Sequence, residues 1–235
     1  MADQDRRDAA APDAADPEPR SAKERILDAA EELFARAGYT GVSLREITQL
    51  AGVEVALANY HFGPKEELFR HVVSRRAEEH CAGVIAALDA AIAASPGRPP
   101  TVDEIVRAFC RYTFEKSTHG GRGWKRYFQL LSRSALLPVY EPILAPLNKP
   151  YGVVVRRYVA VLRAALPTCS EAGIYAGFHY LQAIVGHLLA ETGTVDRQSG
   201  GLVRADDFEG HLARLVPFVA AGFYALASRP ERPPA

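Results

Sequence analysis

Side chains suited to contacting a polyanion or the edge of a nucleobase gather in one stretch of this chain, SLREITQLAGVEVALANYHFGPK at 43–65. The carboxamide of Asn59 can form two hydrogen bonds with an adenine, and the guanidinium of Arg45 can bind a guanine or a phosphate. The hydroxyl of Tyr60 and the ammonium of Lys65 suit phosphate oxygens. The chemistry predicted here is recognition of nucleic acid, if the elements that carry these side chains expose them together.

Two short helices with a tight turn between them are predicted for this stretch. The first begins at Ser43 and has apolar residues at helical spacing, and Gly52 follows it with the freedom to take the left-handed conformation of a helix end. The second covers roughly 55–61, and Pro64 stands where the next helix would start. A helix, a turn that contains glycine and a second helix form a helix-turn-helix unit, whose second helix can enter the major groove of DNA.

This stretch and the helix before it resemble the N-terminal domain of the TetR family of bacterial transcriptional regulators, over about residues 21–70. The resemblance is carried at fixed spacings by Ala29-Ala30, Leu33-Phe34, Gly38-Tyr39, Ser43-Leu44-Arg45-Glu46-Ile47, Ala51-Gly52-Val53, Asn59-Tyr60-His61-Phe62 and Lys65-Glu66-Glu67-Leu68. The string Asn-Tyr-His-Phe resembles a subgroup in which Asn stands where most members carry Tyr, and some regulators of fatty-acid metabolism belong to that subgroup.

The predicted DNA contacts combine residue chemistry with this resemblance. Ser43, together with free amides at a helix N-terminus, suits a phosphate, and the methyl groups of Val55 or Ala56 can touch a thymine. The resemblance implies that the DNA-facing residues are Arg45, Val55, Ala56, Leu57, Asn59, Tyr60, His61 and Lys65. The alternative is that the aromatic residues only seal the small core, which we expect for Phe62 but not for Tyr60.

The charge balance limits how such a surface can bind DNA. The whole chain has 28 basic and 28 acidic residues, and residues 21–80 carry eight Lys and Arg against ten Asp and Glu. A basic footprint is therefore missing, and non-specific affinity should be weak. Glu54 stands where a Ser or Asn cap is usual in the family, and Glu is a poor N-cap that repels phosphate. This balance is also consistent with an alternative, a helical protein whose helix-turn-helix is only an interaction module.

The whole chain is predicted to be all-α, with about nine helices. Capping boxes of the type S/T-x-x-E recur at Ser21/Glu24, Ser43/Glu46, Thr101/Glu104 and Thr168/Glu171. The predicted helices cover about 21–38, 43–51, 55–61, 64–94, 101–116, 124–136, 151–166, 170–192 and 206–227, with a flexible loop at 117–123. The predicted organisation is a disordered tail at 1–20, a three-helix DNA-binding domain at 21–68, a ligand-binding and dimerisation domain at 69–228, and a tail at 229–235.

Two features of the C-terminal region bear on function. Its helices offer an apolar pocket that would suit a lipophilic molecule, with Arg133, His179 or Gln182 to orient a carboxylate and an aromatic lining of Phe109, Tyr112, Trp124, Phe128, Tyr158 and Phe178. Ordinary core packing is the alternative for each of these residues. The last two long helices have small-residue faces that allow close approach. In the resembling family these helices pair two subunits, although the residues alone suit an intrachain contact equally well.

Enzyme and membrane functions find little support. The segment HGGRG at 119–123 has neither the GxSxG partner of a lipase nor the Lys-Ser/Thr of a phosphate loop. His187 and Glu191 share a helix face without an HExxH motif, so neither a metal nor a cofactor is predicted. The apolar run at 174–189 is shorter than the roughly 20 residues that span a bilayer. Three scattered cysteines and an N-terminus without an apolar run favour a cytoplasmic protein without a membrane partner.

We therefore expect a non-enzymatic, ligand-responsive transcriptional regulator, most naturally a repressor. It would bind double-stranded operator DNA as a homodimer through the last two helices. A palindromic operator with half-sites about 34–36 Å apart would match that symmetry. The resemblance to the fatty-acid-responsive subgroup implies a fatty acid or an acyl thioester as the effector.

Overall fold

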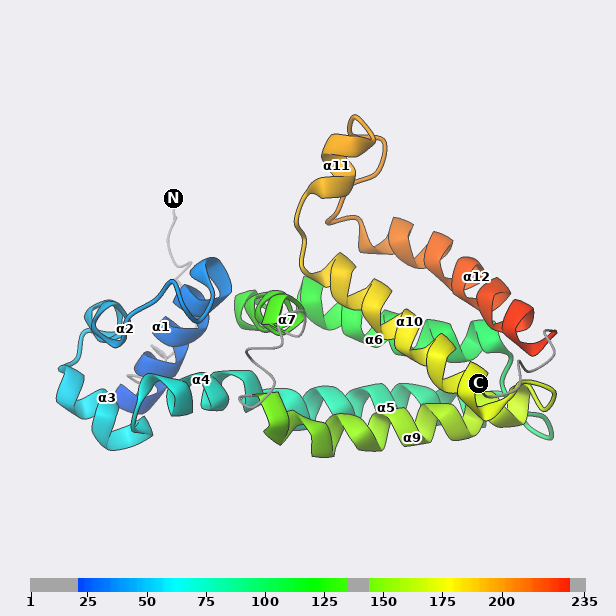
Figure 1. The fold of residues 1–235 in the computed structure, drawn as a ribbon, viewed down its shortest axis with the longest axis horizontal. Coiled ribbons are helices and arrows are strands. Elements are labelled where there is room, and N and C mark those ends of the chain that lie inside the picture. The colour runs from blue at the N-terminus through cyan, green and yellow to red at the C-terminus, as the bar shows by residue number, and fades with distance from the viewer. Residues whose placement is uncertain (1–20, 135–143, 229–235) are drawn as a thin grey trace, which may run out of the picture.

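The computed structural model describes residues 21–134 and 144–228, and every described residue lies in a helix or in a turn or loop between helices. The predicted all-α fold is confirmed. The tails at 1–20 and 229–235 and the last two residues of the helix expected at 124–136 lie outside the described residues. Figure 1 shows an elongated molecule with the helix-turn-helix at one end. That end consists of α1 (Ala22–Ala37), α2 (Leu44–Ala51) and α3 (Val55–Phe62).

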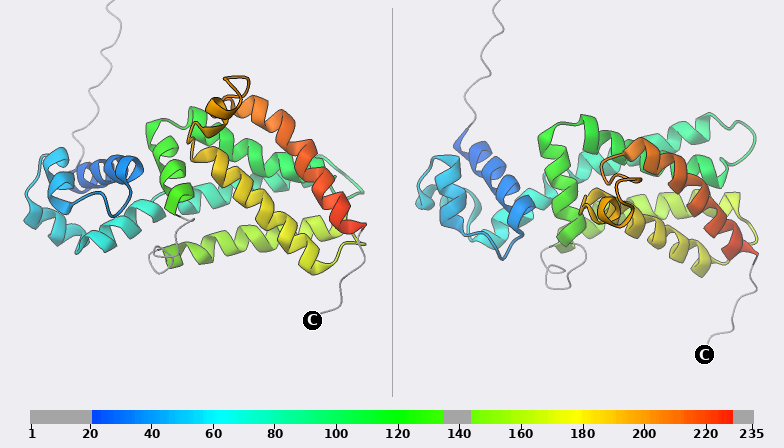
Figure 2. Two further views of the ribbon diagram at one scale, coloured as in Figure 1. Left: turned by 45° about the horizontal axis from the view of Figure 1, so that its top comes forward. Right: turned by 90° about the horizontal axis from the view of Figure 1, so that it is seen from above.

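The remaining helices form the larger part of the molecule, which α4 (Lys65–Ser74) connects to the helix-turn-helix. Both views in Figure 2 keep α1 to α3 together at one end. The other elements are α5 (Ala77–Ala93), α6 (Val102–His119), α7 (Arg122–Ser134), the 3₁₀ turn η2 (Ala145–Leu147), α9 (Asn148–Ala165), α10 (Glu171–Leu189), α11 (Thr194–Gln198) and α12 (Phe208–Ala227).

Helix starts follow the capping pattern of the sequence at three of four expected places. Ser21, Ser43 and Thr101 each accept a hydrogen bond from the amide three residues on, and the glutamate there accepts one in return. The box expected at Thr168/Glu171 is wrong. Ser170 caps α10 instead, because its extended backbone (φ −62°, ψ 153°) directly precedes the first helical residue and its hydroxyl accepts from the Gly173 amide.

The long helix expected over 64–94 is two helices, and the break is at Arg75 and Arg76 rather than at Gly83. Both arginines reach carboxylates of α1: Arg75 binds Asp28 at 2.6 Å, and Arg76 binds the buried Glu31. Gly83 lies inside α5 without interrupting it. A Cβ atom added to Gly83 would lie 1.9 Å from the ring of Tyr112, so this glycine permits α5 and α6 to pack closely.

The expected flexible loop at 117–123 is also wrong, because helix occupies most of it. α6 runs to His119 and α7 starts at Arg122, leaving only Gly120 and Gly121 between them. Gly121 has a φ of 89°, a conformation that glycine adopts without steric cost. This tight connection fixes the direction of α7, which lies beside α1. Within the loop expected at 193–205 the structure also has the short helix α11.

The buried apolar side chains form two clusters, one at each end of the molecule. The N-terminal cluster comes mainly from α1 to α4, and the larger cluster comes from α5 to α12. Two residues from later in the chain, Leu130 of α7 and Leu147 of η2, belong to the N-terminal cluster. The helix-turn-helix therefore packs against α7 and η2, as well as being joined covalently through α4.

Candidate nucleic-acid interface and ligand pocket

The turn between α2 and α3 has the geometry of a helix-turn-helix. Gly52 ends α2 in the left-handed conformation (φ 65°, ψ 43°), as its position in the sequence predicted. Ala58 and Phe62 of α3 are buried against α1, α2 and α4, so the opposite face of this two-turn helix points outward. Phe62 therefore has the core role expected of it. Two short helices held in this way depend on tertiary packing for their stability.

The outward face of α3 carries most of the predicted DNA contacts. Tyr60 is 83% exposed, which is unusual for an aromatic side chain with no partner to cover it. The exposed residues on this surface are Ser43 and Arg45 at the start of α2 and Val55, Ala56, Asn59 and Tyr60 of α3, while Leu57 and His61 are half-buried. The structure thus leaves the side chains predicted to read bases and to bind phosphate at the same end of the molecule.

Two of the predicted contact residues already have partners inside the protein. The ammonium of Lys65 donates to the carbonyl oxygens of Tyr39 and Val42, each at 2.9 Å, and lies 4.2 Å from the centre of the Tyr39 ring. One of its three N–H donors remains for a phosphate. The hydroxyl of Ser43 donates to the Glu46 carboxylate at 2.7 Å. Lys65 and Ser43 therefore shape the surface at least as much as they could bind DNA.

Ion pairs occupy three of the eight lysines and arginines between residues 21 and 80. Arg70 is paired with Glu66 and Glu67, and Arg75 and Arg76 are paired with carboxylates of α1. Arg45 is exposed and makes no ion pair among the described residues. Hydrogen bonds from the hydroxyl and the amide of Ser43 lower the pKa of the neighbouring Glu46, which keeps it anionic. Arg45 is the single Lys or Arg of α2, and its exposed guanidinium is available to a ligand.

A pocket of about 310 Å³ lies among α5, α6, α7, η2, α9 and α10. Its lining is mostly apolar, and among the described residues it contains no side chain that is charged at neutral pH. The lining residues are His80, Phe109, Thr113, Phe128, Leu131, Ser132, Leu144, Leu147, Asn148, Tyr151, Gln182, Val185, Gly186 and Leu189. A mostly apolar cavity with a few polar groups is typical of a small-molecule site. We call it the effector pocket below.

The structure brings only part of the predicted ligand set to the effector pocket. Phe109, Phe128 and Gln182 line it. Tyr112 stacks on His80 from behind, with ring centroids 6.2 Å apart, and Trp124, Tyr158 and Phe178 are core residues. His179 is exposed on α10, and Arg133 donates hydrogen bonds to two main-chain oxygens, so neither residue is placed to hold a carboxylate in this pocket.

Sequence reasoning found Gln182 but missed His80, Thr113 and Tyr151, polar residues of the pocket that are connected by hydrogen bonds. Nδ1 of His80 lies 3.0 Å from the Tyr151 hydroxyl, Nε2 lies 3.2 Å from Oγ1 of Thr113, and the Tyr151 hydroxyl lies 3.2 Å from that of Tyr127. These residues are scattered over four helices, and no local motif marks them. Burial lowers the pKa of His80 to about 4 and raises the pKa of Tyr127 to about 12, so all members are neutral at pH 7.

The wall of the effector pocket is shared with the helix-turn-helix end of the molecule. Leu147 is part of the N-terminal hydrophobic cluster, and Leu131, Leu144 and Tyr151 pack against that cluster. Arg133 strengthens the same junction. Its guanidinium donates to the carbonyl oxygen of Ala35 in α1 at 2.9 Å and to that of Ala190 at the end of α10 at 3.1 Å. A change in the pocket therefore acts on side chains that support α1.

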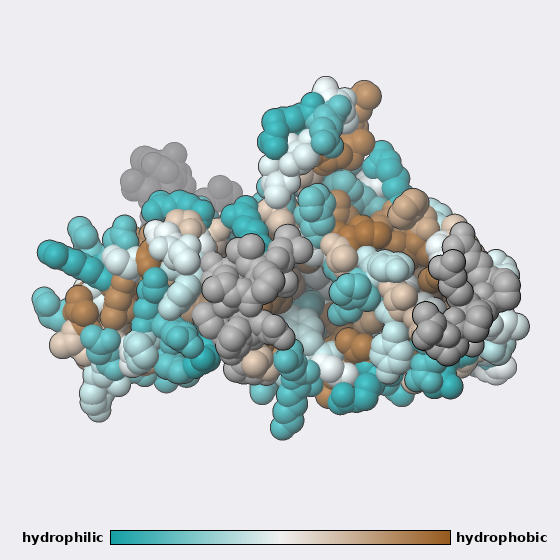
Figure 3. Space-filling model, in the orientation of Figure 1, coloured by the Kyte–Doolittle hydropathy of each residue, from teal (hydrophilic) through white to brown (hydrophobic). Residues whose placement is uncertain are grey.

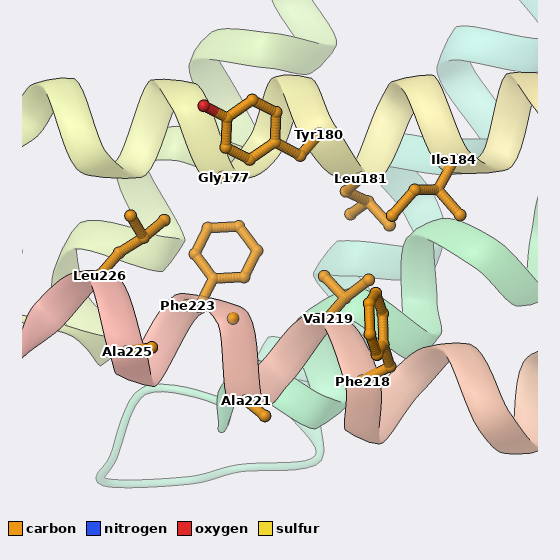
Figure 4. Close-up of a pocket in the computed structure, with 11 residues that line it drawn as sticks. Gly177, Tyr180, Leu181, Ile184, Phe218, Val219, Ala221, Phe223, Ala225 and Leu226 are labelled. Carbon is orange, nitrogen blue, oxygen red and sulfur yellow. The ribbon is translucent and has the colours of Figure 1, made fainter.

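An apolar groove of about 500 Å³ runs between α10 and α12. Figure 4 shows side chains of the two helices pointing toward each other across it, with Tyr180, Leu181 and Ile184 on one side and Phe218, Val219 and Phe223 on the other. The helices approach closely at Gly177, where an added Cβ would lie 2.5 Å from the Phe223 ring. Hydrophobic residues also reach the surface over these helices in Figure 3. Phe218 is 70% exposed and Tyr180 is 58% exposed.

Of the small residues on these helices, Gly177 serves the intrachain contact, whereas Ala221, Gly222 and Ala225 line the open groove. α12 is also long and apolar enough to cross a membrane by length and composition, a test that core helices of soluble proteins pass too. Its buried face, which includes Leu212, Val216 and Phe223, packs into the larger core. The opposite face of α12 is also apolar but exposed, and it includes Phe218 and Tyr224.

Two family models match this chain. Residues 26–72 match the model described as bacterial regulatory proteins of the tetR family, and residues 107–222 match the model described as the tetracyclin repressor-like C-terminal domain. The two matches together take up more than two thirds of the chain. The first contains α2 and α3, and the second contains α7, α9 and α10.

Curated relatives match less than a third of this chain. The chain is 46% identical over 68 residues to the HTH-type transcriptional regulatory protein RaaS of Mycobacterium tuberculosis, covering 29% of this chain and 32% of that protein. It is 36% identical over 56 residues to the HTH-type transcriptional repressor AcnR of Corynebacterium glutamicum, covering 24% of this chain and 30% of that protein. The chain thus spans about a quarter to a third of the length of the curated relatives it matches.

Solved structures share the fold over most of the chain. AmtR of Mycobacterium smegmatis superposes with a TM-score of 0.53 at 17% identity, covering 93% of this chain and 91% of that one. The ketosteroid transcriptional regulator KstR2 of Mycobacterium tuberculosis gives a TM-score of 0.55 at 16% identity, covering 87% and 96%. At these identities the likeness concerns the arrangement of the helices.

Proposed function

Because this chain belongs to the tetR family of bacterial regulatory proteins, we propose that it is a DNA-binding transcriptional repressor that a small lipophilic effector releases from a palindromic operator. In this proposal residues 21–68 bind DNA and residues 69–228 carry the effector pocket and the dimer contacts. It works in the cytoplasm, where operator DNA lies. The alternative, an interaction module that does not read DNA, is less well supported, since the curated relatives of this chain carry names of transcriptional regulators.

The observation that carries the proposal is the outward face of α3. A two-turn helix is held by Ala58 and Phe62, and its other face presents Asn59 and the almost fully exposed Tyr60. An Asn carboxamide can pair with an adenine edge, and a tyrosine hydroxyl suits a phosphate. Arg45 on α2 adds an unpaired cation. The exposed amide, phenol and guanidinium of these three residues together support the proposal, since one exposed aromatic side chain alone would not.

Operator binding is tested with a labelled duplex from the DNA upstream of the protein's own gene, by fluorescence anisotropy. We expect Arg45→Ala and Tyr60→Ala each to weaken binding by about 10-fold to 100-fold, because each lost contact costs roughly 1–3 kcal/mol. Arg156→Ala is the matched control, since Arg156 is exposed on α9, away from the helix-turn-helix end. Circular dichroism checks the fold of each variant. Undiminished binding by both variants would refute these contact assignments.

A symmetric dimer fits the groove between α10 and α12. Its open apolar side is bordered by exposed aromatic residues, and contiguous apolar surface of this kind marks an interaction site. A second copy of the same groove would cover it about a two-fold axis. Such a dimer places two α3 helices against successive major grooves, with half-sites about 34–36 Å apart. Because the charge of the N-terminal region is low, affinity depends on both halves binding together.

Release by an effector follows from the position of the pocket. The effector pocket shares Leu147 with the N-terminal core, so filling it can favour an arrangement of α1 in which the two reading helices are wrongly spaced. The effector can release DNA only by binding that arrangement more tightly. A fatty acid or an acyl thioester is the effector that the Asn-Tyr-His-Phe string suggests. A thermal-shift screen without stabilisation by long-chain acyl compounds would exclude that class.

A further inference from the structure

The protons of the hydrogen-bonded chain in the effector pocket can be assigned one by one. Oγ1 of Thr113 donates to the carbonyl oxygen of Phe109 at 3.0 Å, so it has no hydrogen left for His80 and must accept one from Nε2 of that ring. A neutral imidazole with its hydrogen on Nε2 has an acceptor at Nδ1. Nδ1 is therefore the acceptor for the hydroxyl hydrogen of Tyr151.

The same counting continues outward to Tyr127. Since the single hydroxyl hydrogen of Tyr151 goes to His80, the Tyr127 hydroxyl must donate to the Tyr151 oxygen. Every O–H and N–H in the chain from Tyr127 to Thr113 is then committed to a protein acceptor. What remains toward the pocket is acceptor capacity, one lone pair on the Tyr151 oxygen and one on Oγ1 of Thr113, and both residues line the cavity.

The rest of the lining adds no charge. The other polar side chains are Ser132, Asn148 and Gln182, of which Asn148 is exposed and the other two are half-buried, so they belong to the mouth of the pocket. Two cations are next in sequence to lining residues: Arg133 is bound to two main-chain oxygens, and Lys149 is exposed and is not part of the lining. A carboxylate in this cavity would lose its hydration without gaining a cation, and it would face acceptor lone pairs.

We propose that the effector pocket takes an uncharged lipophilic molecule whose polar end donates a hydrogen bond, such as a hydroxyl group, to the Tyr151 oxygen. This inference rests on the proposed function and narrows its small lipophilic effector to a hydrogen-bond donor. It disfavours both the fatty acid and the acyl thioester that the Asn-Tyr-His-Phe string suggests, because a carboxylate is charged and a thioester carbonyl only accepts hydrogen bonds. The size agrees, because about 310 Å³ lies at the lower end of the roughly 300–1,000 Å³ of small-molecule pockets. Aromatic rings of Phe109 and Phe128 in the lining suit an aromatic or alicyclic body.

Three probes of one shape separate the chemistries: 4-butylphenol donates a hydrogen bond, 4-butylanisole only accepts one, and 4-butylbenzoate is charged. Calorimetric titration and thermal shift of the full chain at pH 7.5, without DNA, give the affinities. We expect 4-butylphenol to bind about tenfold or more tightly than 4-butylanisole, since an unsatisfied buried acceptor costs about 1–3 kcal/mol, and 4-butylbenzoate to bind most weakly. Equal binding of phenol and anisole, stronger binding of benzoate, or binding of none overturns the proposal.

A variant tests the proton assignment itself. His80→Leu removes the acceptor of the Tyr151 hydrogen, which is then free to bond to a ligand oxygen. The preference for 4-butylphenol over 4-butylanisole should fall to about onefold, whereas His119→Leu, at an exposed site, should keep it. An unchanged preference in His80→Leu overturns the assignment. The probe titrations contain no DNA, so their result can be interpreted even if the operator assay shows no binding. In the same way, a failure of the probes to bind does not contradict the DNA-binding proposal.

Discussion

Glu54 opens α3, the helix expected to enter the major groove, and it does so without a cap. Its backbone is extended (φ −75°, ψ 149°), which is the conformation of an N-cap residue, but its side chain bonds to none of the free amides. A shorter side chain with an oxygen on Cβ or Cγ reaches those amides, and a glutamate does not. The carboxylate also lies at the end of α3 that phosphate would approach.

We predict that Glu54→Ser stabilises the protein and tightens DNA binding. The new cap should add about 1 kcal/mol to the free energy of unfolding, and the loss of one negative charge should raise operator affinity several-fold, more at low salt. Urea unfolding and anisotropy titrations at two salt concentrations measure these effects. Glu54→Gln removes the charge without a cap, so it should show the gain in affinity and not the gain in stability. A destabilised Glu54→Ser protein would mean that α3 starts elsewhere.

His80 makes stability depend on pH. Its pKa is about 4 in the folded protein because burial disfavours the charged ring, whereas an unfolded histidine has a pKa near 6.5. Below pH 6.5 the unfolded chain gains a proton that the folded chain does not, so stability is lost as the pH falls toward 4. Above pH 6.5 the residue contributes no pH dependence.

We predict that the free energy of unfolding falls by about 2 kcal/mol between pH 7.5 and pH 5 on account of His80 alone. Urea unfolding at both pH values measures the total change, which includes other groups. His80→Gln should show a total change smaller by that amount, and His119→Gln should match the unaltered protein. Equal pH dependence in all three proteins would show that His80 does not stay neutral when folded.

At the scale of elements, α7 joins the two ends of the molecule, and it does so in two ways. Arg126 reaches Glu32 of α1 at 2.8 Å in a partly exposed ion pair, whereas Arg133 donates to the main-chain oxygens of Ala35 and Ala190. Arg133 is the more exposed of the two residues, but it makes two hydrogen bonds to main-chain oxygens, each worth about 0.5–1.5 kcal/mol, whereas the single ion pair of Arg126 contributes about 0–1 kcal/mol. The hydrogen bonds of Arg133 are thus expected to stabilise the protein more than the ion pair of Arg126 does.

We predict that Arg133→Met destabilises the protein by about 2 kcal/mol and that Arg126→Met costs less than about 1 kcal/mol. Methionine keeps most of the apolar stem in both variants, so the comparison isolates the polar contacts. Urea unfolding gives the energies, and amide hydrogen exchange should speed up at the end of α1 in Arg133→Met only. Similar costs for the two variants would remove Arg133 from the junction between α1 and α10.

At the scale of the whole molecule, the exposed groove between α10 and α12 is the surface assigned to the proposed dimer. Phe218 and Tyr180 lie on opposite sides of it and are among the most exposed large side chains of the described residues. Burying them against a second copy would remove a large apolar area from water, which is the main force in stable homodimers. In the proposed function, one α2–α3 unit has too few free positive charges to bind DNA without the second unit of a dimer.

We predict that Phe218→Asp converts the dimer to a monomer of 25.6 kDa and abolishes measurable operator binding. A charge placed in an apolar interface loses its hydration without gaining a partner. Light scattering at micromolar concentration gives the mass. Leu202→Asp is the control, because Leu202 is 87% exposed and lies outside the groove. A monomeric mass for the unaltered protein would contradict the dimer at once.

The sequence by itself determined the local features of this protein. The all-α class, three of four capping boxes, the glycine turn after α2 and the outward residues of α3 follow from neighbours within a few positions, where helix geometry is fixed by the chain itself. The motifs at fixed spacings also identified the family, and a tetR family model matches residues 26–72 of the same region.

Only the tertiary structure decided which side chains meet. It ended α4 at Arg75, because carboxylates of α1 lie beside that point, and it assembled the effector pocket from His80, Thr113 and Tyr151 on three helices. It also gave Arg133 and Lys65 main-chain partners that residue type does not reveal. These contacts join residues up to 98 positions apart, and their energies depend on how whole helices pack rather than on any local pattern.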